Sequence, residues 1–472
     1  MKKESLFSIK WVWLFSFLYC IVIAIFIQFI VLPHVFPGLH AGDGLLVGTD
    51  SVGFHRIAVE LAEKINANGF HEWQLRPQGH SPAGIAALFY ALTGVHKPFV
   101  LVPLNAAVHA TALIVLLLII RQYLPSPKKS VLCVVPFLLF PTAIGWYAQI
   151  HKDGIFILGF FVALFGILSF FRKAAVTLQW QMIVINILSM VGGGFLVWIA
   201  RPYGVTLLIA ISIFISFVLF LYNFYKTRKQ QLPVRLVKSV IIFCTFLVPL
   251  IILFPLAEVK GEGGVTIDNL ESVSETSTEK EDGREEPQKL VLKEKWIKSR
   301  LIPSSIDSKL YTIANARYRY FLIYPDAGST IDKDVRFHSA GDMIAYLPRA
   351  LQISLFAPFP YQWFERGAKS GGTIMRKIVG AEMALSYVAL IGLPFAIVFW
   401  RKRIELWVAL LFSLSLMIVY SLTIPNIGAL HRMRYGFYMI VLAVSVGGWI
   451  TLITRLKNKI RLLDTARCYE NY

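Results

Sequence analysis

The chain has 472 residues, of which 56% are hydrophobic and only 16% are charged, and its mean hydropathy is +0.62. Soluble domains carry about 25% charged residues and their cores stop growing at about 250–300 residues, so this composition excludes a cytosolic enzyme, a secreted disulfide scaffold and a nucleic-acid-binding domain. The formal net charge is +19, and in a membrane protein the informative property of this excess is the side of the bilayer on which the cations lie.

The first apolar run predicts an uncleaved membrane-spanning helix. It extends from Trp11 to about Leu32, which is longer than the apolar region of a signal peptide, and no small-residue cleavage site follows it. The sequence predicts an all-α integral membrane protein with about ten transmembrane helices. Further runs of spanning length lie at about 98–120, 130–147, 154–171, 181–200, 204–224, 239–257, 378–400, 405–424 and 435–454.

The distribution of Lys and Arg predicts that both termini are cytoplasmic. If every run spans once, the basic connections fall on the same face as Lys2 and Lys3, and cytoplasmic loops carry such an excess of cations. We therefore expect a multi-pass protein of the plasma (inner) membrane. The basic connections are 121–129, 172–173, 226–238 and 401–403, together with the tail from Arg455.

This topology divides the chain into three parts. Residues 1–257 form an N-terminal module of seven spans with a helical outer loop at 33–97, and residues 378–472 form a C-terminal module of three spans and a basic cytoplasmic tail. A second large outer loop lies between them. Its residues 258–290 are acidic and rich in Ser, Thr and Gly, so we expect disorder there, whereas 291–377 should fold against the membrane surface with Arg317 and Arg319 exposed.

The first outer loop is patterned as two helices. The first has a helical stretch at Arg56–Asn68, and Asp50, shortly before it, is the expected N-cap. The second covers about Pro82–Leu92 and stops at Gly94. The four-residue spacing of apolar side chains predicts that the first is an amphipathic helix on the membrane interface. These side chains are Ile57, Leu61 and Ile65.

Two short motifs in this loop resemble a known superfamily. Residues 50–58 are similar to an Asp-x-x-x-Tyr/Phe-His-x-x-Ala pattern, and residues 81–94 are similar to a Pro…Leu-x-Tyr-x-Leu-x-Gly stretch. Over about residues 1–225 the chain resembles the GT-C membrane glycosyltransferases, which include protein mannosyltransferases, aminoarabinose transferases and oligosaccharyltransferases. The resemblance implies inverting transfer of a sugar from a polyprenyl-phosphate-linked donor to a glycan, lipid or polysaccharide acceptor on the outer face.

Such a reaction needs a carboxylate near the acceptor hydroxyl and cations near the leaving phosphate. Asp50 is the candidate base, although a plain N-cap aspartate is an equally good interpretation. Asp43 is a neighbouring alternative, and His55 belongs to the same motif.

Three more candidates lie in short outer connections. Lys152 and Asp153 occupy the turn between the third and fourth spans, and Arg201 follows the fifth. A cation on a short outer connection runs against the positive-inside bias, which predicts a carboxylate or phosphate partner; the alternative is an interfacial anchor. Asp153 is a second catalytic candidate. Together with Asp50 it would suit a divalent cation, and the sequence suggests no other cofactor.

The strongest departure from the charge rule lies between the last two spans. Residues 425–436 include Arg432 and Arg434, whose planar guanidinium groups suit bidentate binding of a donor phosphate; contact with bulk lipid headgroups is the alternative. We expect His431 and Tyr435 to support them, and Glu382, near the outer end of the eighth span, to pair with one of the arginines.

Two other functions use similar architecture. A polymerase of lipid-linked polysaccharide repeat units shares many spans and outer-face arginines. A non-enzymatic transporter or flippase of lipid-linked glycans should instead place its charges near mid-membrane and show internal repeats. The charges here gather at the outer rim, which favours an enzyme whose partners are a lipid-linked donor, an acceptor and membrane lipids, and no nucleic acid.

Overall fold

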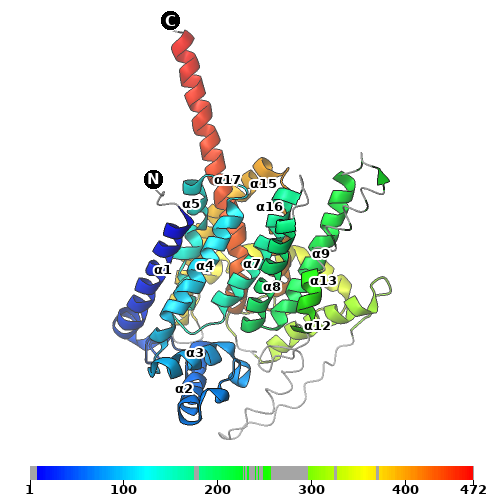
Figure 1. Ribbon diagram of the computed structural model, residues 1–472. Coiled ribbons are helices and arrows are strands. Elements are labelled where there is room, and N and C mark those ends of the chain that lie inside the picture. Colours follow the sequence, from blue (N-terminus) through cyan, green and yellow to red (C-terminus); the bar gives the residue numbers. More distant parts are fainter. Residues whose placement is uncertain are drawn as a thin grey trace.

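The chain is an all-helical membrane protein (Figure 1). The computed structural model describes residues 8–174, 180–226, 228, 231–232, 236, 240, 243, 248–256, 296–323, 327–367 and 371–470. Within these residues, seven helices are long and apolar enough to cross a membrane, or eight if one bent pair counts as a span. The predicted run at 239–257 lies partly, and the acidic stretch at 258–290 wholly, outside the described residues.

The helices of the bundle follow the apolar runs of the sequence, but fewer than the ten predicted spans are counted among the described residues, because the apolar part of α7 is shorter than the counted spans and the run at 239–257 is only partly described. Helix α1 continues into a π-helix that ends at Val35, and the run expected at 378–400 is divided between α14 and α15. The bounds are α1 Ile9–Phe26, α4 Val102–Ile120, α5 Pro127–Leu139, α6 Pro141–Tyr147, α7 Asp153–Ala174, α8 Trp180–Ala200, α9 Tyr203–Lys226, α14 Gly372–Leu390, α15 Gly392–Trp400, α16 Ile404–Thr423 and α17 Ile427–Glu470.

The bent pair is α5 and α6, which meet at an angle of 70°. Phe140, the residue between them, is extended (ψ 134°) because the following Pro141 disfavours a helical conformation in the residue before it. Pro141 also has no N–H to donate to the preceding turn. The bend turns α6 away from the axis of α5 just before the connection that carries Lys152.

Helices α2 (Asp50–Asn68) and α3 (Ser81–Thr93) form a cap at one end of the bundle, opposite the end where α1 begins and α17 finishes (Figure 1). The apolar face of α2 is covered by α3, so the predicted membrane-surface position of that face is wrong. Gly94 ends α3 in the left-handed conformation, φ 69°, as predicted. The contact joins Ile57, Leu61 and Ile65 of α2 with Ala83, Ala86, Ala87 and Tyr90 of α3.

Helices α7 and α8 approach so closely that only glycine fits at the crossing. A Cβ atom on Gly193 would lie 2.5 Å from the carbonyl oxygen of Gly159, and a Cβ atom on Gly159 would lie 2.7 Å from that of Gly193. Small residues permit such backbone approach in membrane bundles. The crossing matters because α7 begins at Asp153 and α8 ends one residue before Arg201.

We expect Gly193→Val to destabilise the protein by about 1–3 kcal/mol, since the clash is with backbone and cannot be relieved by rotating a side chain. Gly192→Val is the matched control, because a Cβ atom on the neighbouring Gly192 has no heavy atom within 4 Å. Thermal unfolding in detergent should show a lower midpoint for Gly193→Val alone. Equal midpoints for both variants would contradict the inferred packing.

The region predicted as the second outer loop contains helices α12 (Ser304–Ile323) and α13 (Ala340–Phe356). Segment 327–338 joins the start of α17: the Ile331 N–H donates to Pro425 O at 2.9 Å and the Ile427 N–H to Ser329 O at 2.9 Å. Arg317 is only 1% exposed, so its predicted surface position is wrong. Its guanidinium packs among the rings of Phe321, Phe337 and Tyr346.

Candidate functional site

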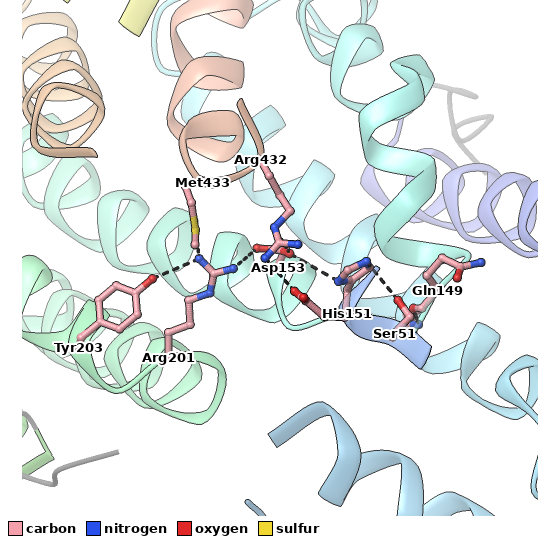
Figure 2. A network of polar contacts seen from close by, with 10 residues as sticks. Ser51, Gln149, His151, Asp153, Arg201, Tyr203, Arg432 and Met433 are labelled. Carbon is pink, nitrogen blue, oxygen red and sulfur yellow. Dashed lines mark hydrogen bonds and ion pairs between the residues drawn. The ribbon is translucent and has the colours of Figure 1, made fainter. Parts of the chain in front are cut away.

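Three charged side chains from distant parts of the sequence, those of Asp50, Asp153 and Arg432, meet at the end of the bundle capped by α2. Arg432, in the second turn of α17, donates from Nη2 to Asp50 Oδ2 at 3.0 Å. Its Nε lies 3.6 Å from Asp153 Oδ2 (Figure 2). The side chains of Asp50 and Arg432 are 49% and 31% exposed, whereas that of Asp153 is 3% exposed. The Asp50–Arg432 side is therefore the accessible side of the cluster.

A second arginine, Arg201, pairs with Asp153 on its buried side. Arg201 Nη2 lies 2.5 Å from Asp153 Oδ1, and both side chains are buried. Arg201 also donates to the Tyr203 hydroxyl at 3.2 Å and contacts Met433 (Figure 2). Because Asp153 is the first residue of α7, the positive end of that helix also favours its carboxylate. Arg201 thus already has a carboxylate as its counter-charge.

Asp50 does not cap its helix. The N-cap of α2 is Thr49, whose backbone is extended, and Asp50 is the first helical residue, with its carboxylate directed to Arg432. Burial would raise the pKa of Asp50, but Arg432, His151 and Lys152 outweigh it and hold that pKa below its usual range. The carboxylate is therefore ionised at neutral pH.

His151 joins the cluster, although the sequence analysis did not single it out. Its Nδ1 lies 3.8 Å from Asp153 Oδ2 and its Nε2 lies 3.3 Å from Ser51 Oγ (Figure 2). Burial lowers the pKa of His151 to about 4, so the imidazole is neutral at pH 7. The signal in the sequence that could have identified it is its place two residues before Asp153, in the short connection between α6 and α7.

Lys152 is the cation of this site without a carboxylate bonded to it. Its Nζ lies 5.8 Å from the centre of the Phe54 ring, and no hydrogen bond or ion pair of its ammonium occurs among the described residues. Burial and then Arg201 lower the pKa of Lys152 to about 8, against the opposing effect of Asp153 and Asp50. It lines a cleft together with Ser81, Asn105 and His151.

The charges of the site do not cancel. Lys152, Arg201 and Arg432 contribute three positive charges, Asp50 and Asp153 contribute two negative ones, and His151 is neutral, so 3 − 2 leaves +1. A half-buried site with excess positive charge attracts anions. Arg432 and Lys152 are the two cations with capacity to receive one.

Arg434 does not reach this cluster. It is 1% exposed, and its guanidinium donates to the carbonyl oxygens that end α13: Ile353 at 2.6 Å, Ser354 and Ala357. Residues two apart on a helix point about 200° apart, so Arg432 and Arg434 face opposite sides of α17. Arg434 therefore joins α13 to α17.

The predicted pairing of Glu382 with an arginine is wrong. Its Oε1 lies 3.3 Å from His431 Nε2, and its Oε2 accepts from the Thr142 hydroxyl at 2.9 Å. These buried contacts join α14, α17 and α6, and His431 directly precedes Arg432 in the chain. Tyr435 packs edge-on against Trp146, with ring centroids 4.3 Å apart.

Asp43 and His55 form a separate pair. Asp43 binds Lys97 Nζ at 2.5 Å and lies 3.8 Å from His55 Nε2. His55 Nδ1 in turn lies 2.9 Å from the Tyr90 hydroxyl. These contacts brace the loop before α2 against α3. The structure thus brings Asp50, Lys152, Asp153, Arg201 and Arg432 together, and leaves Asp43, His55 and Arg434 elsewhere.

The cluster contains two carboxylates, those of Asp50 and Asp153, of the kind that bind divalent cations. Among the described residues, no group of three His, Cys, Asp or Glu side chains is placed to hold a metal ion. Asp50 and Asp153 share Arg432 between them, so in this arrangement a guanidinium stands where a cation bridging both carboxylates would lie.

Comparison with protein-family models finds no match, and comparison with curated proteins finds none either. Among solved structures the chain is similar to the archaeal oligosaccharyltransferase AglB from Archaeoglobus fulgidus, solved in complex with an inhibitory peptide and a dolichol-phosphate. The identity is 12%, the TM-score is 0.48, and the match covers 97% of this chain. The chain spans about half of that structure's length, 52%.

Proposed function

We propose that the protein is a membrane glycosyltransferase that takes a sugar from a polyprenyl-phosphate-linked donor on the outer face of the plasma membrane and gives it to a glycan, lipid or polysaccharide acceptor. The observation that carries the proposal is the placement of Arg432 at an accessible carboxylate, Asp50, beside the unpaired ammonium of Lys152. These groups supply a base and two phosphate ligands at one place.

The reaction that suits this geometry is an inverting displacement. The acceptor oxygen attacks the anomeric carbon while its proton passes to Asp50, and the bond from that carbon to the phosphate oxygen breaks with its electron pair moving to the phosphate. Arg432 and Lys152 stabilise the charge that develops on the leaving phosphate. Asp153 and Arg201 are buried beneath and position Arg432.

The Asp50–Arg432 ion pair sets the order of events. Ion pairing with Arg432 keeps the pKa of Asp50 low, which makes it a weak base in the donor-free state. A donor phosphate competes with Asp50 for the guanidinium fork, because Arg binds phosphate bidentately. Donor binding would therefore release Asp50 from Arg432 and raise its basicity only while a polyprenyl phosphate group occupies the site.

The test is titration of the purified protein in detergent with a polyprenyl phosphate. We expect Arg432→Gln to weaken binding about 10- to 100-fold, since hydrogen bonds to charged groups contribute about 1.5–3 kcal/mol. Arg376→Gln is the matched control, because Arg376 lies outside the cluster and forms an ion pair with Glu365, with an N–O distance of 2.7 Å. Wild-type affinity in Arg432→Gln would refute the proposed donor site.

Binding should also depend on pH through Lys152. The pKa of Lys152 is lowered to about 8, so its ammonium loses its proton as the pH rises through that value. We expect the affinity for a polyprenyl phosphate to fall about tenfold between about pH 7 and pH 9, whereas the phosphate itself loses no negative charge over this range. Lys152→Arg stays protonated and should abolish the dependence. The same decline in Lys152→Arg would contradict the role given to Lys152.

A further inference from the structure

A second pocket lies in the outer region, apart from the Asp50 cluster. It is open to solvent, with about 380 Å³ of space when the volume at its mouth is included, and it lies between α12 and the segment that precedes α13. Both walls come from residues 296–338, and α12 lies toward the end of the bundle that carries α2 and α3 (Figure 1). It is lined by Trp296, Tyr311, Ala314, Asn315, Arg317, Tyr318, Phe321, Val335, Arg336, Phe337 and His338.

Aromatic rings held in fixed positions form one side of this pocket. The indole N–H of Trp296 donates to Asp307 Oδ2 at 2.9 Å, which fixes the ring beside that of Tyr311, at a centroid distance of 5.8 Å. Tyr311 is 37% exposed. The apolar C–H faces of pyranose rings pack on such surfaces, and the amide of Asn315 adds a donor and an acceptor for hydroxyl groups.

The first cation of the pocket, Arg317, is buried without a carboxylate bonded to it. Its guanidinium packs among three aromatic rings and makes long hydrogen bonds to two carbonyl oxygens, 3.3 Å to Ser421 and 3.4 Å to Asp332. Its Nε has no partner among the described residues. The side chain of Asp332 is instead taken by Arg349, with two contacts of 3.0 Å, and by the Tyr346 hydroxyl at 2.6 Å. The nearby carboxylate of Asp332 is thus bonded to other groups, and a buried guanidinium with no carboxylate bonded to it among the described residues is suited to receive an anion.

The second cation, Arg336, lies on the other side of the same ring. Its guanidinium is 4.5 Å from the centre of Phe321, and in the described part of the chain it donates only to the backbone carbonyl oxygens of Lys333 and Val335. Arg317 is 5.4 Å from the same ring centre. Two guanidinium groups without carboxylates therefore stand beside rings that suit a sugar.

We propose that this pocket binds an acidic sugar unit, one that carries a carboxylate, and that this unit belongs to the acceptor; the second part rests on the proposed function. Arginine forks match a carboxylate bidentately, and the aromatic wall receives the sugar ring. The pocket is tied to the donor site through backbone hydrogen bonds between segment 327–338 and the residues on either side of Asn426, which begin the helix that carries Arg432.

The proposal is tested by calorimetric titration of the full chain in detergent with a tetrasaccharide of alternating glucuronic acid and N-acetylglucosamine. A neutral N-acetylglucosamine tetramer is the comparison ligand. We expect the acidic tetrasaccharide to bind at least about tenfold more tightly, and we expect Arg336→Gln and Tyr311→Ala each to weaken it about tenfold or more. Arg376→Gln should leave it unchanged, which removes nonspecific attraction to the basic chain as an explanation.

Equal binding of both saccharides, or wild-type affinity in Arg336→Gln and Tyr311→Ala, would overturn the proposal. A synthetic peptide of residues 258–287 is titrated in parallel. If the peptide binds in a manner that depends on Arg336 while the tetrasaccharide does not bind, the pocket recognises an acidic peptide and the proposal is wrong. Arg432→Gln should not change saccharide binding, so failure of the donor site and failure of this pocket give different results.

Discussion

Asp50→Asn is expected to lower the rate of sugar transfer in proteoliposomes by about 10²- to 10⁴-fold, the usual contribution of a positioned general base. Asparagine keeps the shape of the side chain and cannot accept the proton. The affinity for polyprenyl phosphate should rise at the same time, because the substitution removes the ion-pair partner of Arg432. A loss of rate combined with tighter donor binding is the signature that a merely structural role would not give.

Asp43→Asn is the matched control for this prediction. Asp43 is the other aspartate of the first outer loop, is 37% exposed, and pairs with Lys97 instead of Arg432. The assay uses whichever polyprenyl-phosphate sugar the wild-type protein turns over. Transfer by Asp50→Asn at a rate near that of Asp43→Asn would remove Asp50 from the mechanism.

The second large effect is expected on stability. Arg201→Gln leaves the buried carboxylate of Asp153 with more distant neighbours, the Nε of Arg432 at 3.6 Å and the Nδ1 of the neutral His151 at 3.8 Å. Losing one partner of a buried ion pair such as Asp153–Arg201 costs about 3–5 kcal/mol. Thermal unfolding in detergent should show a strongly lowered midpoint. The double variant Arg201→Gln/Asp153→Asn should recover much of the loss, because it removes the unpaired charge as well.

That double variant separates packing from charge. If it is as unstable as Arg201→Gln alone, the loss of stability comes from the volume and contacts of the arginine side chain. The charge interaction between Asp153 and Arg201 would then not be what stabilises the buried part of the site. The Tyr203 hydroxyl, which accepts from Arg201 at 3.2 Å, is retained in both variants and so does not affect the comparison.

Much of the fold could be predicted because the relevant signals are local in sequence. The apolar run from Trp11 and the stop at Gly94 each report on their own segment, and most helices begin and end within a few residues of the expected positions. The exceptions include α17, which covers Ile427–Glu470 where the sequence predicts a span at 435–454, and α2, which begins at Asp50. The surroundings of the apolar face of α2 could not be predicted in this way. The apolar spacing predicts that this face is buried, but only the tertiary structure shows that its packing partner is α3.

The arginines of α17 show the same limit. Taken as residues of a turn, Arg432 and Arg434 would both face the site; the helix begins at Ile427 instead, and helical geometry directs them to opposite sides. Arg201 is similar, because nothing in its segment indicates that a residue 48 positions away neutralises it. The cations that contradicted the charge rule therefore divide into buried structural partners, Arg201 and Arg434, and accessible groups, Arg432 and Lys152.

The most direct test of the donor site is an electron cryomicroscopy structure of the protein with a bound polyprenyl phosphate. We expect the phosphate within hydrogen-bonding distance of Arg432 and Lys152, Asp50 released from Arg432, and the polyprenyl chain lying along the outside of the bundle. A phosphate bound away from these residues, or a lipid lying along a path through the bundle as in a transporter, would contradict the proposed transferase.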